Sequence, residues 1–409
     1  MDLPLKLLEL IFQRLCLDDV MNCRATCHSW RKAADAIFSS QLPLMLSLST
    51  TCCGSFGSLS APWSNHDSTV LTEKWPQEID RTYNNRVQSV QGWLVFNIFH
   101  YEWFKAQTFS ELSFFNPFSR ARFKLPKLFL FSGGPCYYQL RVAFNSALPG
   151  SEEFVVAFLF VFSNQEKEYY SMGPEDSKQR LAFIKFKQGS WIESIESDEI
   201  FYDIQVDDDN KLYGLTFKHQ TSVVFVFTLG DNHRDDHVVE RLVMLNTIED
   251  VDAAVSRFIF SRAFFKRSHQ MVIDTSTGEL LLVRHLRNRC YYDLSVHTKG
   301  FNVFKLDRNN LKWCEVFDIG DRFLFWDFTK ASLVSAKGLR LAERFKRGNC
   351  IFFCHANTRC QKPPYYPFSD GFKDHDMGVF FLVDRTISHF SISSSLSISR
   401  RNMWFSPAL

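Results

Sequence analysis

The sequence predicts a mainly β protein in which three short helices precede a long region of strands. Two observations lead to this fold class. The 409 residues include 43 Phe, 12 Tyr and 9 Trp, and aromatic rings pack well on a half-buried sheet but lose rotamer freedom in a helix. Apolar residues also recur at helical spacing up to about residue 40, and from about Leu42 they fall into short strand-like runs bounded by Gly, Asp and Asn.

The first helix is predicted to carry an unusually wide apolar stripe. Its apolar residues recur every three or four positions at Leu3, Leu7, Leu8, Ile11, Phe12 and Leu15. Pro4 lies at the helix start, where its missing N–H costs nothing. A short helix with so wide a stripe must bury one side against its own neighbours and the other side against something else.

Two further helices are expected to complete this segment. Asp18 and Asp19 suit the positive end of a second helix that runs to about Ala25. A third helix, which closes over the first two, is predicted from the spacing of Cys27, Trp30, Ala34 and Ile37. The periodicity alone also allows a helical cap or a dimerisation segment that packs on the following domain.

The first forty residues resemble an F-box. The motif elements are Leu-Pro at 3–4, Leu-Leu at 7–8, Ile-Phe at 11–12, Leu15, and Cys-x-x-Trp-Arg at 27–31. The resemblance implies a helix trio that docks on a Skp-type adaptor, which in turn carries a cullin and a RING protein. It implies that the adaptor is bound by Leu3, Pro4, Leu7, Leu8, Ile11 and Phe12, and that the internal core of the trio contains Leu15, Cys27 and Trp30.

The rest of the chain is predicted to be a β-propeller. Two stretches are weak copies that both read strand, turn, Trp, strand: 183–187, 191–193 and 200 onwards, and 301–305, 313–315 and 323–326. A repeated small sheet that buries its faces on its neighbours is typical of a propeller. At about 40–50 residues per blade, the region holds about seven or eight blades, within a range of six to eight.

Two hairpins are specific enough to be placed. Met271–Asp274 and Glu279–Val283 are joined by Thr-Ser-Thr-Gly, whose Gly278 can take the positive φ that such a turn demands. Asp207, Asp208 and Asp209 are expected to form a polar hairpin turn, because they lack the ligand spacing and the terminal Glu of a calcium loop.

A second resemblance covers this region. Short motifs occur in a shared order at 115–117, 125–126, 278–284, 301–307, 312–316, 319–325, 348–353, 376–380 and 404–407. This order is similar to that of plant F-box proteins with a kelch-like C-terminal domain of long-unassigned function. The resemblance implies an F-box over 1–40 and a kelch-like, F-box-associated propeller over 42–409.

Composition argues against several classes of partner. The formal net charge is only +2, so no global field favours nucleic acid or an anionic membrane. The longest apolar run, Phe154–Phe162, is half of what a bilayer-spanning helix needs and suits a fully buried strand. Eleven Cys without a secretory leader indicate a reducing compartment, the cytoplasm or the nucleus.

No catalytic motif and no cofactor site are predicted. The sequence contains no Gly-rich phosphate loop, no G-x-S-x-G and no H-E-x-x-H. Cys350, Cys354, His355 and Cys360 have the residue types of a zinc shell. However, Cys350 and Cys354 would lie on one face of a strand, so buried strand cysteines are the favoured interpretation and no metal is expected.

These observations predict a non-catalytic substrate-recognition subunit of a Skp-cullin-F-box ubiquitin ligase. The helices would bind the adaptor, and the propeller would hold a protein substrate near the ubiquitin-loaded partner. The alternative is a propeller-based interaction or regulatory module that acts without a ligase; a small-molecule enzyme would need convergent carboxylates or a metal. The substrate-binding residues are not identified, but aromatic and Arg residues on loops are candidates: Tyr291, Tyr292, Tyr365, Tyr366 and the loop Arg287-Asn288-Arg289.

Overall fold

The computed structural model describes the larger part of the chain. The described residues are 3–12, 15, 17–39, 44–51, 54–60, 69–74, 86–90, 92–102, 107–117, 119–132, 141–145, 147, 150–163, 177–185, 192–197, 201–218, 221–228, 238–247, 269–289, 296–327, 330–336, 345, 348–355, 376–390 and 401–405. At some of these positions, inside helices and strands, only the backbone is described.

Three helices form the N-terminal segment, as predicted: α1 (Leu5–Phe12), α2 (Leu17–Arg24) and α3 (His28–Ser39). The carbonyl oxygen of Pro4 accepts hydrogen bonds from the N–H groups of Leu7 (2.9 Å) and Leu8 (3.2 Å). Proline suits this position because it has no N–H to leave unsatisfied in the first turn. Both α1 and α2 pack on α3. None of the described helices is long and apolar enough to cross a membrane.

From residue 44 onwards the described chain is built almost entirely of strands, which confirms the mainly β class. The strands form six sheets. The first sheet has the order β26 (Arg401–Phe405), β1 (Leu44–Thr51), β2 (Gly54–Ser60) and β3 (Thr69–Lys74). The second has the order β4 (Arg86–Val90), β5 (Trp93–Glu102), β6 (Gln107–Phe115) and β7 (Arg122–Lys124), with β8 (Leu128–Ser132) also paired to β6. The third has the order β9 (Arg141–Phe144), β10 (Val155–Ser163), β11 (Ser177–Lys185) and β12 (Ile192–Ser197).

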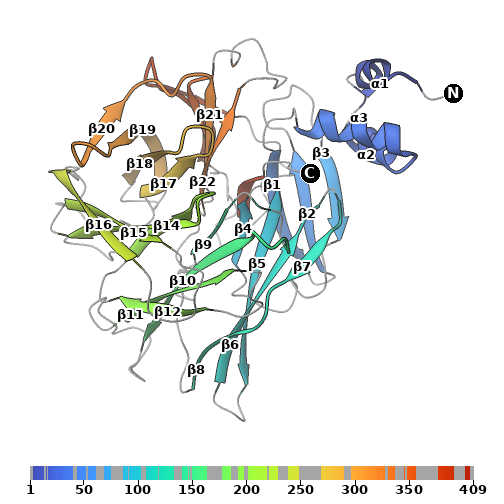
Figure 1. The fold of residues 1–409 in the computed structure, drawn as a ribbon. Helices are drawn as coiled ribbons and strands as arrows, with labels where there is room; N and C mark the ends of the chain where they lie inside the picture. Colours follow the sequence, from blue (N-terminus) through green and yellow to red (C-terminus); the bar gives the residue numbers. More distant parts are fainter. Residues whose placement is uncertain are drawn as a thin grey trace, which may run out of the picture.

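The other three sheets continue the series around the molecule (Figure 1). The fourth sheet has the order β13 (Phe201–Val206), β14 (Lys211–Lys218), β15 (Thr221–Thr228) and β16 (Val238–Thr247). The fifth has the order β17 (His269–Asp274), β18 (Glu279–Arg289), β19 (Val296–Asp307) and β20 (Lys312–Val316). The sixth has the order β22 (Ala331–Ser335), β21 (Arg322–Asp327), β23 (Cys350–His355), β24 (Asp376–Phe381) and β25 (Thr386–His389). Four of the six sheets have four strands each. The pairing is antiparallel except between β21 and β23.

The internal repeat is confirmed. Residues 183–185 end the third strand of one sheet, β11, and residues 301–305 lie in the third strand of another, β19. In each sheet the next part of the repeat, residues 192–193 or 313–315, lies in the fourth strand, β12 or β20, and the strand after it belongs to the following sheet. The two stretches therefore occupy equivalent places in two repeated units.

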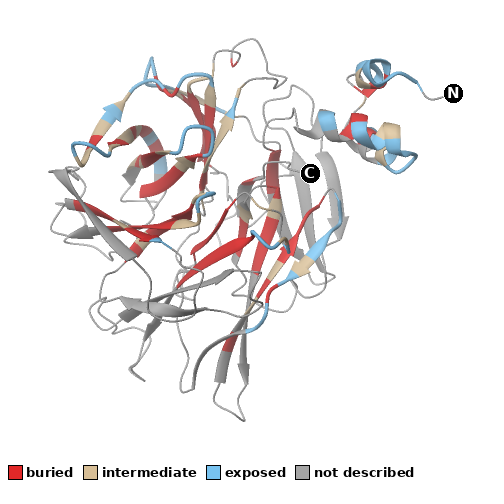
Figure 2. Ribbon diagram, viewed as in Figure 1, coloured by how far each residue is buried: buried red, intermediate tan, exposed pale blue. Residues whose placement is uncertain are grey.

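The hydrophobic core lies between the sheets (Figure 2). One cluster joins β9–β10 to β13–β15, a second joins β14–β15 to β17–β20, and a third joins β17–β19 to β21–β25. A fourth joins β21–β24 to β1 and β26. Sheets that bury their faces on both neighbours give the propeller arrangement that the sequence predicts. The predicted burial of 154–162 is confirmed for Phe154 to Leu159, each at most 2% exposed.

The two ends of the strand region meet in one sheet. β1 pairs with β26 in antiparallel register, with Leu44 opposite Phe405 and Leu48 opposite Arg401. This pairing covers an edge of β1 that would otherwise expose unpaired backbone groups. The helices lie beside this sheet in Figure 1, and α2 contacts β3.

The strands at one end of each sheet, including both β22 and β21 in the last sheet, also bond to one another around the molecule. Their side chains reach the backbone of the next sheet: Gln88 accepts from Val142 N–H (3.2 Å), Gln205 donates to the Met271 carbonyl (2.7 Å), Gln270 donates to the Asp327 carbonyl (2.8 Å), and Asp327 accepts from Trp404 N–H (3.0 Å). β26 in turn contacts β4. We refer to β4, β9, β13, β17, β21–β22 and β26 as the inner strands.

Candidate functional site

The first candidate site is the outer face of α1. Leu8 and Phe12, one helical turn apart, are 0% and 1% exposed, and the Phe12 ring meets the Trp30 ring edge to face at 5.4 Å between centroids. The opposite face exposes Leu7 (47%), Leu10 (56%) and Ile11 (41%), and Leu3, just before the helix, is 44% exposed; Leu5, at the helix start, is 37% exposed. We call Leu3, Leu7, Leu10 and Ile11 the outer face of α1. The helix thus buries one side and leaves the other uncovered in this chain.

This geometry divides the six residues predicted to bind the adaptor into a buried set and an exposed set. Leu8 and Phe12 are buried in this chain, because the 3.6-residue period turns them towards α3. The exposed part of the predicted face is Leu3, Pro4, Leu7 and Ile11. Leu10 was not predicted, although its position three residues after Leu7 could have revealed it.

The predicted core of the helix trio also changes. Trp30 is partly buried and contacts Phe12, and Leu15 is partly buried. Cys27 is exposed rather than internal. It immediately precedes α3, where its carbonyl oxygen accepts the Arg31 N–H (2.9 Å), so it caps the helix start instead of facing the interior.

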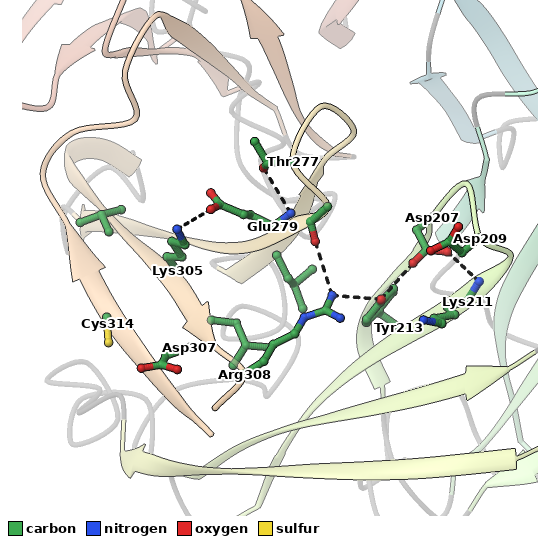
Figure 3. A pocket seen from close by; sticks show the side chains of 14 residues that line it. Asp207, Asp209, Lys211, Tyr213, Thr277, Glu279, Lys305, Asp307, Arg308 and Cys314 are labelled. Atoms are coloured by element: carbon green, nitrogen blue, oxygen red, sulfur yellow. Dashed lines mark hydrogen bonds and ion pairs between the residues drawn. The ribbon is translucent and has the colours of Figure 1, made fainter. Parts of the chain in front are cut away.

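The second candidate site is a cavity of about 730 Å³ between two neighbouring sheets. The turn between β13 and β14, the turn between β17 and β18 and the turn between β19 and β20 build its wall (Figure 3). Both predicted hairpin turns are among them and are confirmed. Gly278 has a φ of +70°, and Asp207 holds its turn by accepting the Lys211 N–H at 2.7 Å.

A chain of polar contacts crosses this cavity. The Tyr213 hydroxyl donates to a carboxylate oxygen of Asp207 (2.9 Å) and accepts from the Arg308 guanidinium (3.2 Å), which lies 5.8 Å from the Tyr213 ring centroid. Nearby, the Lys305 ammonium pairs with the Glu279 carboxylate. Burial and the neighbouring Asp207 raise the pKa of Tyr213, so its hydroxyl stays a neutral donor. The wall therefore offers fixed charges of both signs to a polar ligand.

A second acid in the wall is held in its charged form. The Asn310 side chain donates to Asp307 at 2.8 Å, and this hydrogen bond lowers the pKa of the Asp307 carboxyl. Since Asp307 thereby caps its own turn, its carboxylate shapes the cavity rim. Among the lining residues, no Ser, His or Cys is hydrogen-bonded to a base in the way that nucleophilic catalysis requires.

The predicted substrate anchors are only partly placed. Tyr291, Tyr292, Tyr365 and Tyr366 lie outside the described residues. The segment Arg287-Asn288-Arg289 is not a loop but the end of β18, where Arg287 pairs with Thr298 and Arg289 with Val296 of β19. A register shift after Leu286 lets the hairpin continue through residues whose polarity suggested a loop.

The cysteines of the considered zinc site are placed in the core. Cys350 and Cys354 lie on one face of β23 and are both fully buried, which confirms the predicted buried strand cysteines. Burial raises the pKa of the Cys350 thiol to about 12, and burial together with Asp327 and Asp376 raises the pKa of Cys354 well above its usual value. Cys360 and the side chain of His355 lie outside what the structure describes, and no group of three metal-ligating side chains is found in the described part of the chain.

Comparison with solved structures gives matches of low similarity. The GH43 protein BlXynB from Bacillus licheniformis is 11% identical, covering 57% of this chain and 41% of that chain, with a TM-score of 0.30. An acylaminoacyl peptidase from Pyrococcus horikoshii is 11% identical, covering 78% and 44%, with a TM-score of 0.30. The WD40 domain of SCAP from fission yeast is 9% identical, covering 66% and 73%, with a TM-score of 0.20. The chain thus spans less than half the length of the first two.

Comparison with protein families identifies both parts of the chain. No curated protein matches it. The F-box domain matches residues 1–37, which contain α1 and α2 and most of α3. The KIB1-4 beta-propeller matches residues 56–381, from β2 to β24. Because this second match covers well over half of the sequence, the chain belongs to the KIB1-4 beta-propeller family and carries an F-box domain over residues 1–37.

Proposed function

We propose that this protein is the substrate-recognition subunit of a Skp-cullin-F-box ubiquitin ligase. The observation that carries the proposal is the outer face of α1, four large apolar side chains that remain exposed in the F-box domain. Helices expose such a row when it docks into a partner's groove. A Skp-type adaptor would cover it and bring the cullin and RING subunits.

The propeller would supply the other half of this function. It would hold a protein substrate on the scaffold that carries the ubiquitin-loaded partner, so that the two reactants meet at high effective concentration. The chain itself would make and break no bond. The charged cavity between the β13–β16 and β17–β20 sheets supports a binding role for this region, because its side chains are fixed by their own contacts.

The proposal assigns the two functions to two domains of the chain. Residues 1–40 would form the F-box and residues 42–409 a kelch-like propeller, with the six sheets as its blades. The sequence of contacts between inner strands supports this count, since each sheet bonds to the next and β26 returns to β4. The protein would act in the cytoplasm or the nucleus, where its free thiols stay reduced.

The decisive experiment measures adaptor binding by co-purification of the full-length chain with a Skp-type adaptor. Leu7→Asp and Ile11→Asp each place a charge in the outer face of α1, and each is expected to weaken binding at least tenfold. Both side chains are exposed, so the helices should keep their circular dichroism signal. Asn22→Asp adds the same carboxylate at an exposed position of α2 and is the matched control.

If the Ile11→Asp variant still bound the adaptor as tightly as the wild type, the proposed ligase function would be rejected. The alternative is then an interaction module that uses the propeller without a ligase. A form without residues 1–40 separates the two, because under the ligase proposal it still captures the substrate protein but no longer lowers its level in cells. Under the alternative, deletion of the F-box leaves the cellular effect of the protein unchanged.

A further inference from the structure

Two large apolar side chains are exposed on the propeller. Among its described residues, Phe317 (54% exposed) and Val383 (70% exposed) are the only large apolar residues with this degree of exposure. They belong to neighbouring sheets, since Phe317 follows β20 and Val383 lies in the turn between β24 and β25. A single exposed apolar side chain is ordinary, but exposed apolar side chains that meet often mark a binding surface.

Arg385 connects these two side chains. Its guanidinium, two residues after Val383, lies 5.9 Å from the Phe317 ring centroid and 3.7 Å from a carboxylate oxygen of Glu315. The turn that carries Val383 is therefore placed against Phe317. The ring keeps more than half of its surface exposed even with this contact. We call Phe317, Val383 and Arg385 the Phe317 patch.

Asn349, just before β23, holds both segments of the patch. Its side-chain oxygen accepts the Ile319 N–H (2.9 Å), and its side-chain amide donates to the Phe317 carbonyl oxygen (3.4 Å). Its own carbonyl oxygen accepts the Leu382 N–H (3.3 Å). The two segments are thus joined in the free protein, and a surface that is already ordered loses less entropy when it binds a partner.

The described residues of these two segments are mainly acidic. Residues 315–321 and 382–385 contain one cation, Arg385, and four exposed acids: Glu315, Asp318, Asp321 and Asp384. The next cation along the chain, Arg322, is bound by the buried Asp274 at 2.7 Å. The apolar patch therefore has an acidic surround, which attracts basic partners and disfavours nucleic acid and anionic membranes.

We propose that the Phe317 patch binds a short segment of the substrate protein in which one apolar side chain is flanked by Lys or Arg. The apolar side chain packs on Phe317 and Val383, and its basic neighbours face the surrounding carboxylates. A cation over the ring is compatible with this surface, because Arg385 already occupies such a position. The inference rests on the proposed function, which makes the partner a ligase substrate.

The same charges argue against a second copy of this chain as the occupant. A two-fold interface would place the patch on its own equivalent, so that acids would face acids. Like charges opposite one another at an interface cost free energy. A basic segment avoids this cost and is the occupant that fits both the apolar pair and its surround.

The test uses the full-length chain and fluorescein-labelled peptides of defined sequence. The probe Gly-Ser-Arg-Leu-Arg-Ser-Gly presents one apolar side chain between two cations. Replacing both Arg by Glu tests the charge requirement, and replacing Leu by Ser tests the apolar contact. Fluorescence anisotropy at low ionic strength gives the Kd of each peptide.

The basic apolar probe is expected to bind at least tenfold more tightly than its Glu analogue and at least threefold more tightly than its Ser analogue. Phe317→Ser should weaken its binding at least tenfold, because the centre of the patch is lost. Asp384→Asn should weaken it by about two- to fivefold, as expected for one exposed charge pair. The matched control is Glu152→Gln, which neutralises an exposed acid in the turn before β10 and should leave the Kd unchanged.

The proposal is overturned if the basic apolar probe does not bind, if either analogue binds as tightly, or if Phe317→Ser leaves the Kd within twofold. Val383→Ser takes the place of Phe317→Ser in this comparison if the latter does not fold. Adaptor co-purification reports on the proposed function separately, because α1 lies in the F-box domain. Probe binding without adaptor binding rejects the ligase role and leaves the patch as an interaction surface, whereas adaptor binding without probe binding overturns this inference alone.

Discussion

The positive charge of Lys330 lowers the stability of the folded protein. Its ammonium lies 6.0 Å from the Phe144 ring centroid of another sheet, and the attraction of Asp203, which also pairs with Arg141, only partly offsets the effect of burial. The lowered pKa means that folding disfavours the protonated form, with an energetic effect of the order of 2 kcal/mol once its partial exposure is taken into account.

Replacing Lys330 should therefore stabilise the protein, and the effect should depend on pH. Below pH 8 the lysine is protonated in both the folded and the unfolded chain, so the whole unfavourable term is present. Between pH 8 and about 10.5 the folded chain loses the proton first, so the wild type gains stability relative to Lys330→Met. Urea unfolding at pH 7, 8.5 and 10 measures the free energy of unfolding. This free energy should be larger for Lys330→Met than for the wild type at pH 7, and the difference should become small at pH 10. A less stable variant at pH 7 would contradict this reading.

Exposure of single residues was the least predictable feature of the site. The stripe Leu3, Leu7 and Ile11 was visible in the sequence, but Leu8 and Phe12 have the same residue types and spacing. Only the position of α3 decides which side of α1 is covered. Cys27 illustrates the same limit, because a helical period cannot distinguish a first core residue from a cap just before the helix.

At the scale of elements, the tight turns of the propeller set its local geometry. Gly278 and Gly348 have φ values of +70° and +67°, which favour glycine. Their surroundings differ. A Cβ on Gly278 would meet nothing within 4 Å, whereas a Cβ on Gly348 would lie 2.8 Å from the Arg322 backbone nitrogen and 2.8 Å from the Gly320 carbonyl oxygen.

This pair gives a matched prediction. Gly278→Ala should cost about 1 kcal/mol, because only the backbone conformation is strained. Gly348→Ala should cost at least about 2–3 kcal/mol, since the turn must also move away from the strand β21 that it contacts. Chemical denaturation of the two variants under identical conditions measures the difference, and equal losses would show that the backbone around Gly348 yields easily.

Local elements were predictable and distant pairings were not. The turns at Asp207–Asn210 and Thr275–Gly278 follow from residues adjacent in sequence, and both form as expected. That these two turns and the one at Arg308 enclose a single cavity depends on how neighbouring sheets pack. The parallel pairing of β21 with β23, after the chain has already formed β22, likewise has no signal in strand periodicity.

For the whole molecule, the most distant pairing is the one that closes it. The five-residue strand β26 brings the C-terminal part of the chain beside β1. Trp404 anchors it: the side chain is 3% exposed, its indole N–H donates to the Trp326 carbonyl (3.1 Å), and its ring packs on Phe325 and Phe352. Holding such distant segments together has an entropic cost that grows only slowly with loop length, so a few buried contacts suffice.

Trp404→Ala should therefore destabilise the pairing of β26 with β1 more than it destabilises the other sheets. Removing a buried Trp costs about 3–5 kcal/mol, and here the lost contacts release β26 and expose the edge of β1. Hydrogen exchange should speed up first in Leu44–Thr51.

Trp313→Ala is the control, because it removes an equally buried ring, 2% exposed, whose indole N–H donates to Ser222 at 2.8 Å between two neighbouring sheets. Its faster exchange should centre on β15 and β20. If Trp404→Ala left β1 as protected as Trp313→Ala does, the pairing of β1 with β26 would not be what holds the ends of the propeller together.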